Sequence, residues 1–193
     1  MKHAVCQELY SYWNELRGLR LAPDRGDLDP GAIRGILGDV FVLELDDAGN
    51  FRFRISGARV NALFVDELKG TGFANMWRQS SRPALADLIL SVLEDTAAAV
   101  AGVTSAPTGR PYLQLEMLLL PLRHLGQSHT RLLGCLAPAS VPSWLGLVAS
   151  EPLTLGPMRM LRPNGQGPYF AVTSTNPDAT TRRGHLRIHQ GGA

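Results

Sequence analysis

Apolar residues near the start of the chain recur with the spacing of a helix. Over residues 5–18 they lie three or four positions apart, as on one face of an amphipathic helix. The members of this stripe are Val5, Leu9, Tyr12, Trp13 and Leu16. Gly18 predicts the end of the helix. A segment rich in Pro, Asp and Gly follows, and Asp29 before Pro30 predicts the start of a second, short helix.

The next pattern is that of a β-hairpin. Residues 40–45 are rich in β-branched and aromatic side chains, and residues 51–56 alternate between apolar and polar, so both are predicted strands. A turn-forming cluster of Asp, Gly and Asn joins them. After Gly57 the apolar spacing lengthens from two to three or four, which predicts a short helix up to Phe64. A second short helical segment is expected over residues 70–77.

A longer amphipathic stripe predicts the main helix, over residues 83–100. Its apolar members are Leu85, Leu88, Ile89, Val92, Leu93, Thr96 and Val100. Three strands are predicted after it, at residues 102–107, 112–122 and 130–138. Residues 141–148 are expected to form a short covering segment.

The order of these elements predicts an α+β fold. Two strands, a helical stretch and three further strands in local hairpins fit a five-stranded antiparallel sheet with helices on one face. We expect an N-terminal flanking helix and linker (1–28), a main domain (29–140), a covering segment (141–161) and a tail (162–193). The tail contains few large apolar residues, which predicts disorder.

Composition narrows the class of protein. The chain has 193 residues, of which 45% are hydrophobic and 19% charged, as in globular proteins. Its net charge of +2 is too small to indicate a nucleic-acid partner. Positive charge concentrates in the basic tail, where Arg162, Arg182, Arg183 and Arg187 outnumber Asp178. The rest of the chain is therefore nearly neutral.

Cysteine content and hydropathy indicate a soluble cytoplasmic protein. Cys6 and Cys135 are far apart and lack a metal-type spacing, which excludes a disulfide scaffold and fits a reducing compartment. Polar residues interrupt the start of the chain, so no signal peptide is expected. The longest apolar run, residues 113–122, contains Glu116 and is shorter than the roughly 20 residues that a membrane span needs.

The stretch from residue 51 to residue 70 resembles the most recognisable region of the PAS domain. In that family a strand runs into a short helix with an apolar pair, and then into a turn that contains glycine. The matching positions are Phe53, Ile55, Gly57, Leu63, Phe64, Leu68 and Gly70. The order of elements is similar too, because PAS domains have two strands, short helices, a longer helix and a three-stranded meander.

A narrower resemblance begins earlier in the chain. The strings YWNELRG, from Tyr12, and DPGAIRGILGDVFVLEL, up to Leu45, look like the signature of a compact, mostly stand-alone bacterial PAS subfamily of poorly defined function. The resemblance covers residues 8–140. The subfamily more often has a glycine near Val65 or Asp66, so we expect a different turn geometry there. The resemblance implies a stand-alone sensory or protein-interaction module in bacterial signalling.

In PAS domains that bind ligands, the ligand lies between the sheet and the helices. That space would be lined here by Phe41, Phe53, Ile55, Phe64, Met76, Trp77, Leu88, Met117, Leu133 and Cys135. These residues either enclose an apolar small molecule or fill a closed core. Haem-binding members take iron from a histidine on the long helix, and blue-light photoreceptors use a cysteine among the short helices. Residues 83–100 contain no histidine and residues 58–77 contain no cysteine, so no cofactor is expected.

The sequence contains none of the common catalytic or metal-binding motifs. His124 and His129 flank a predicted hairpin loop without a third ligand nearby, so we expect no metal site there. We therefore expect that the protein is not an enzyme. The alternative is a small α+β enzyme or carrier with an apolar pocket, whose best candidate residue is Glu116. Strand alternation groups Glu116 with Gln114 on a mostly polar face, so we expect its side chain outside.

Aromatic residues on the N-terminal helix are candidates for an interface. An isolated helix of this length is not stable in water, so it must pack on its own sheet, on another helix or on a second copy. Tyr10, Tyr12 and Trp13 are residue types that interfaces favour. Two alternatives stay open: packing within the domain, and contact with a partner protein or in a homodimer.

Overall fold

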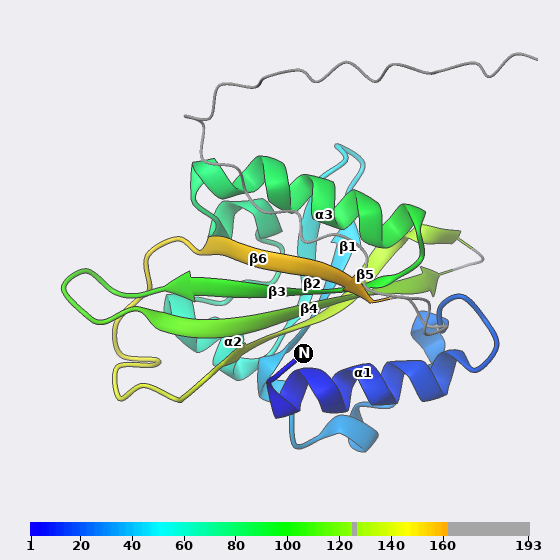
Figure 1. Ribbon diagram of the computed structural model, residues 1–193, viewed down its shortest axis with the longest axis horizontal. Helices are drawn as coiled ribbons and strands as arrows, with labels where there is room; N and C mark the ends of the chain where they lie inside the picture. Colours follow the sequence, from blue (N-terminus) through cyan, green and yellow to red (C-terminus); the bar gives the residue numbers. More distant parts are fainter. Residues whose placement is uncertain (125–126, 162–193) are drawn as a thin grey trace, which may run out of the picture.

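The computed structural model describes residues 1–124 and 127–161 as a six-stranded antiparallel sheet with helices packed on it (Figure 1). The three α-helices are α1 Ala4–Arg17, α2 Ala58–Phe64 and α3 Arg82–Glu94. The strands are β1 Val40–Leu45, β2 Phe51–Ser56, β3 Ala98–Ser105, β4 Leu113–His124, β5 Gln127–Pro138 and β6 Thr154–Leu161. Their order across the sheet is β2-β1-β5-β4-β3-β6. The predicted α+β class is confirmed, and so are the five predicted strands.

Short 3₁₀ helices complete the fold. They are η1 Arg25–Asp27, η2 Pro30–Ile33, η3 Leu37–Asp39, η4 Phe73–Met76 and η5 Gln79–Ser81. The short helix predicted after Asp29 begins as expected, because the Asp29 side chain accepts a hydrogen bond from the N–H of Gly31 at 2.8 Å. It continues as 3₁₀ turns rather than as an α-helix.

The sixth strand was not predicted from the sequence. Residues of β6 pair with β3 and extend the sheet beyond the expected edge. The sequence pattern does not predict this strand, because it contains Gly156 and Pro157, and both residue types are poor strand formers. Pro157 is tolerated since β6 is itself an edge strand, where a missing N–H costs no ladder bond on the open side.

The predicted end of the long helix is wrong by several residues. The helix was expected to continue to residue 100, but α3 ends at Glu94 and β3 starts at Ala98. Thr96 has a φ of +48°, in the left-handed region, and turns the chain between the two elements. The stretch that follows α3 is apolar and buried, so its hydrophobicity does not distinguish a helix from a buried strand.

Helices cover both faces of the sheet, not one. Figure 1 shows α3 on one side of the strands and α1 on the other. The helices inserted between β2 and β3 do gather on one face, as predicted. The opposite face of β4 and β5 is also apolar, with Leu118, Leu120 and Leu133 buried against the α1 side. A sheet that is apolar on both faces needs a cover on each, and α1 supplies the second one.

A close backbone approach and an ion pair hold the start of α2 against η3. A Cβ on Gly57 would lie 2.3 Å from the carbonyl oxygen of Leu37, so glycine is required there. Arg59 donates two hydrogen bonds to the buried carboxylate of Asp39, from Nε at 2.8 Å and from Nη2 at 2.5 Å. The hydrogen bond to Asp39 raises the pKa of Arg59 above its ordinary value. The change of period at Gly57 therefore marks the point where α2 is held against η3.

The segment after β5 packs on α2. Its Gly146 N–H donates to the carbonyl of Ala62 at 3.0 Å, and Ser150 N–H donates to that of Leu63 at 2.7 Å. No helix in residues 1–124 and 127–161 has both the length and the hydropathy to cross a membrane. The predicted disordered tail, residues 162–193, lies outside the residues that the structure describes.

Candidate functional site

Most residues predicted to line a ligand pocket do meet on the α3 face of the sheet. Those in or against this core are Phe41, Phe53, Phe64, Met76, Trp77, Leu88 and Met117. Leu133 and Cys135 belong to the core on the α1 face, because β5 alternates and its other residues point toward α3. Ile55 is 48% exposed on the edge strand β2. These three side chains therefore lie outside the space that the sequence assigned to them.

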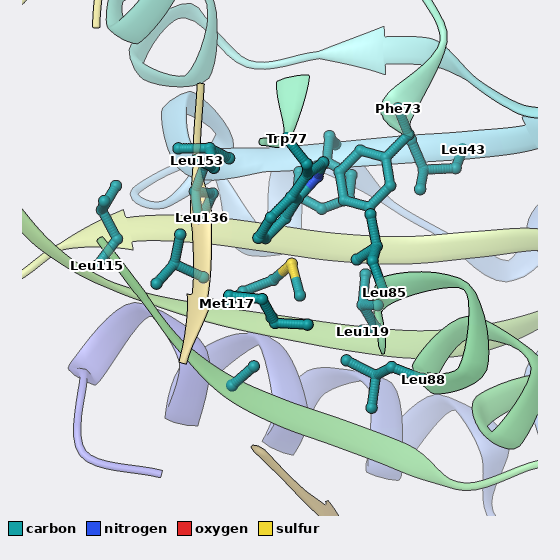
Figure 2. Close-up of a cluster of buried hydrophobic side chains, with 14 of the residues drawn as sticks. Leu43, Phe73, Trp77, Leu85, Leu88, Leu115, Met117, Leu119, Leu136 and Leu153 are labelled. Atoms are coloured by element: carbon teal, nitrogen blue, oxygen red, sulfur yellow. The ribbon is translucent and has the colours of Figure 1, made fainter. Parts of the chain in front are cut away.

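Aromatic rings fill the middle of the predicted pocket. Phe73 lies 5.5 Å from both Phe41 and Phe53 between ring centroids, and Trp77 continues the chain of rings at 5.7 Å from Phe73. The Phe73–Trp77 pair is T-shaped, with an angle of 72° between the rings. The buried indole N–H of Trp77 has no hydrogen-bond acceptor in the described part of the chain. Figure 2 shows Phe73 and Trp77 next to each other in this core, above Met117 and Leu119 of β4.

Beside this filled core lies an open groove of about 480 Å³. Its walls are the turn that leads into β2, the segment around η4, and the first half of α3. The Gly70 N–H donates to the carbonyl of Phe53 at 2.7 Å, so the chain before η4 is fixed along β2. The apolar part of its lining consists of Phe51, Phe73, Leu85, Ile89 and Leu90, and the polar side chains of Asn50 and Asn75 also line it. Leu90 is 53% exposed, which leaves apolar surface open at the rim.

Two arginines border the groove, and they differ in their partners. Arg52 forms an ion pair with Asp46 and donates to the carbonyl of Gly70. The half-buried Arg82 donates from Nε to the carbonyl of Trp77 at 3.2 Å. No carboxylate within residues 1–124 and 127–161 forms an ion pair with Arg82. The groove therefore combines a mainly apolar lining with a guanidinium that has no ion-pair partner among the described residues.

Sequence reasoning did not identify this groove or Arg82. The lining residues come from three segments that are far apart in the sequence. The pattern of each segment is explained by its own secondary structure, so none of them indicates a shared groove. Arg82 itself precedes Pro83 at the start of the main helix, where a polar residue is ordinary. The one available signal was the exposed Leu90 outside the predicted apolar stripe of α3.

Glu116 lies on the α1 face and holds the start of α1. Its carboxylate accepts hydrogen bonds from the backbone N–H groups of Lys2, at 2.8 Å, and His3, at 3.1 Å. Burial of the carboxyl group acts to raise its pKa, but the bonds from Lys2 and His3 outweigh this and hold the pKa below its ordinary value. Glu116 is half-buried rather than outside, and its role is to stabilise a helix terminus.

The aromatic residues of α1 pack within the domain. Trp13 is fully buried, and its indole N–H donates to the carbonyl of Pro121 on β4 at 2.9 Å. The Tyr12 hydroxyl accepts a hydrogen bond from the N–H of Asp29 at 2.6 Å. Tyr10 is half-buried and stacks on Trp13 with 6.0 Å between ring centroids. Of the two alternatives for this helix, packing on its own sheet accounts for Trp13.

Metal ligands do not gather in the described part of the chain. No group of three or more His, Cys, Asp or Glu side chains lies close enough there to hold a metal ion. The side chain of His129 lies outside the part of the chain that the structure describes.

Comparison with known proteins identifies the family. A protein-family model described as "PAS domain" matches residues 1–137. No curated protein matches the chain, and no solved structure matches it either. The matched range includes α1, the hairpin, α2, α3 and the meander β3 to β5, which form every strand of the sheet except β6 and the helices on both of its faces. The chain belongs to the PAS domain family.

Proposed function

We propose that this protein acts as a sensory or protein-interaction module of bacterial signalling, without chemistry of its own. It would bind a small molecule that has an apolar body and an anionic group, in the groove between β2, η4 and α3. The observation that carries this proposal is Arg82, which lines the apolar groove and has no carboxylate partner among the described residues. The protein would act in the cytoplasm, through a partner protein or a second copy of itself.

The chemistry of the groove selects this class of ligand. A volume of about 480 Å³ is in the range of small-molecule sites. Apolar surface on Phe51, Ile89 and Leu90 favours burial of a hydrocarbon or aromatic body. A guanidinium forms short, strong hydrogen bonds with carboxylate or phosphate oxygens. An uncharged apolar molecule would leave Arg82 without such a partner.

Binding at this position can change the surface that a partner meets. A ligand in the groove would contact β2, η4 and α3 together, because each of these elements contributes lining residues. It would therefore bias the position of α3 relative to the edge of the sheet. Such a shift matters only if the ligand binds one arrangement better than the other.

The test uses decanoate as a probe, with decan-1-ol as the uncharged control of the same chain length. Isothermal titration calorimetry should show binding of decanoate to the full chain and weaker binding of decan-1-ol. Arg82→Gln should weaken decanoate binding about tenfold, the loss expected for one charge-assisted contact. Arg34→Gln is the matched control, because Arg34 is exposed and does not line the groove.

Two results would count against this function. One is equal binding of decanoate by the wild-type protein and by Arg82→Gln. The other is the absence of binding by the wild-type protein together with no stabilisation by any of a panel of aromatic and aliphatic carboxylates and phosphates.

A further inference from the structure

The two cysteines of the chain meet in the folded protein. Cys6 lies on α1 and Cys135 on β5, and 129 positions separate them in the sequence. Their sulfur atoms are 3.4 Å apart, and both side chains are fully buried. The sequence suggested no relationship between them, since neither the spacing nor the neighbouring residues form a motif.

Both sulfur atoms are carried by well-held elements. The Cys6 Sγ also contacts the carbonyl oxygen of Glu116, at 3.7 Å, so it is directed from α1 onto the sheet. Cys135 is paired in the sheet with Val40 on one side and Leu118 on the other. The two thiols therefore face each other across the contact between α1 and the sheet.

We propose that Cys6 and Cys135 form a reversible disulfide bond that fastens α1 to the sheet when the protein is exposed to a peroxide. A disulfide bond is about 2.0 Å long, so the sulfurs must approach by roughly 1.4 Å. Rotation of two side chains and a small movement of α1 can supply this. In the oxidised protein, the disulfide bond would hold α1 to the sheet covalently, in addition to packing and hydrogen bonds.

The reaction balances with hydrogen peroxide as the oxidant. First, the sulfur of one thiol attacks an oxygen of hydrogen peroxide: the S–O bond forms, the O–O bond breaks, and the other oxygen leaves with the thiol proton as water, which gives a sulfenic acid. The second thiol then attacks the sulfenic sulfur, the S–S bond forms, and the hydroxyl leaves as a second water molecule. Two thiols are oxidised by two electrons in total, and one peroxide is reduced. A dithiol reductant reverses the reaction by thiol–disulfide exchange.

Burial makes this oxidation depend on the movement of α1. The hydrogen bond with Cys135 and burial raise the pKa of the Cys6 thiol, and a neutral thiol is a poor nucleophile. The pair should therefore react slowly while α1 is packed on the sheet. When α1 lifts, Cys6 becomes accessible to peroxide, and its return brings the sulfenic acid against Cys135. Oxidation would thus occur only after α1 detaches, and the resulting disulfide bond would prevent a second detachment.

Mass spectrometry of the full chain tests the proposal. Reduced protein is treated with hydrogen peroxide and digested with trypsin without reductant. We expect an intact mass lower by two hydrogen atoms, and a linked pair of peptides, His3–Arg17 with Leu132–Arg159. Dithiothreitol should restore the reduced mass. Formation of sulfinic acids or intermolecular dimers in place of the linked pair would overturn the proposal.

A shifted cysteine provides the matched control. In the double variant Cys6→Ser/Gln7→Cys, the thiol moves one position along α1, to an exposed side chain directed away from Cys135. This variant should oxidise faster than the wild type, because its thiol is accessible, but it should form little intramolecular disulfide. If it forms the intramolecular bond as readily as the wild type, the packing of α1 does not direct the reaction, and the proposal is wrong.

Discussion

The ring of Phe41 occupies the space where a side chain of Gly134 would lie. The two residues are partners across β1 and β5, and a Cβ on Gly134 would be 2.4 Å from Cζ of Phe41. Because position 134 has no side chain, Phe41 can lie over β5 and contact Phe53 and Phe73. One glycine in the meander thus permits the aromatic cluster that fills the α3 side of the sheet.

Gly134→Ala should destabilise the protein by about 1–3 kcal/mol, because the added methyl group overpacks a rigid contact. Urea unfolding followed by tryptophan fluorescence would measure the loss. In the Phe41→Leu background, Gly134→Ala should cost less stability than in the wild type, because leucine lacks the ring atoms that meet the new methyl group. Additive effects of the two substitutions would show that the contact does not cause the loss.

Val65→Gly should stabilise the protein by about 1 kcal/mol, because a β-branched residue is strained in the left-handed region. Val65 has a φ of +53° and a ψ of +39° and follows the end of α2. The backbone at this position therefore adopts a conformation that suits glycine. Val65 is also 50% exposed, so little burial is lost. Thermal unfolding measures the effect. Val65→Ala keeps a Cβ and should therefore stabilise the protein less than Val65→Gly does. A lower melting temperature for Val65→Gly than for wild type would contradict this account.

Arg59→Gln should cost about 1–3 kcal/mol, because it leaves the buried carboxylate of Asp39 without its bidentate partner. This loss of stability is smaller than that for a fully buried ion pair, because the Arg59 side chain is 41% exposed. The joint variant Asp39→Asn/Arg59→Gln should be less destabilised than Arg59→Gln, since no buried charge remains. Urea unfolding of the single and joint variants gives the coupling energy between the two side chains. A coupling near zero would mean that the ion pair does not hold α2.

Glu116→Gln should destabilise the protein at neutral pH, and the difference from wild type should shrink as the pH falls. The folded-state pKa of Glu116 lies below its ordinary value, so the unfolded chain binds the proton more readily. The stabilisation is therefore present above the ordinary glutamate pKa of about 4.3 and is lost as the pH falls through the folded value. Urea unfolding between pH 7 and pH 3 would show this. Glu8→Gln, an exposed change on α1, serves as the control and should leave the pH dependence unchanged. A constant difference between wild type and Glu116→Gln across this range would refute the role of the carboxylate.

Much of the fold could be predicted from local patterns. The alternation over residues 51–56 and the lengthened spacing after Gly57 identified β2 and α2, because each pattern reflects a single face of a single element. The motif around these residues also led to the family, which the match over residues 1–137 confirms. Where apolar residues cover all sides of a segment, periodicity carried no information, and the boundary between α3 and β3 was misplaced.

The sequence by itself determined the α+β class, the five strands of the meander and hairpin, and membership of the PAS domain family. It did so because strand and helix periods, and the glycines and prolines that interrupt them, act over a few residues. Only the tertiary structure decided that α1 covers the second face, that β6 extends the sheet, and that Leu133 and Cys135 face α1. It also decided that Arg82 lines an apolar groove and that Cys6 meets Cys135. These relationships join residues that are distant in sequence. They depend on which apolar faces pack against each other, and local sequence patterns do not specify this.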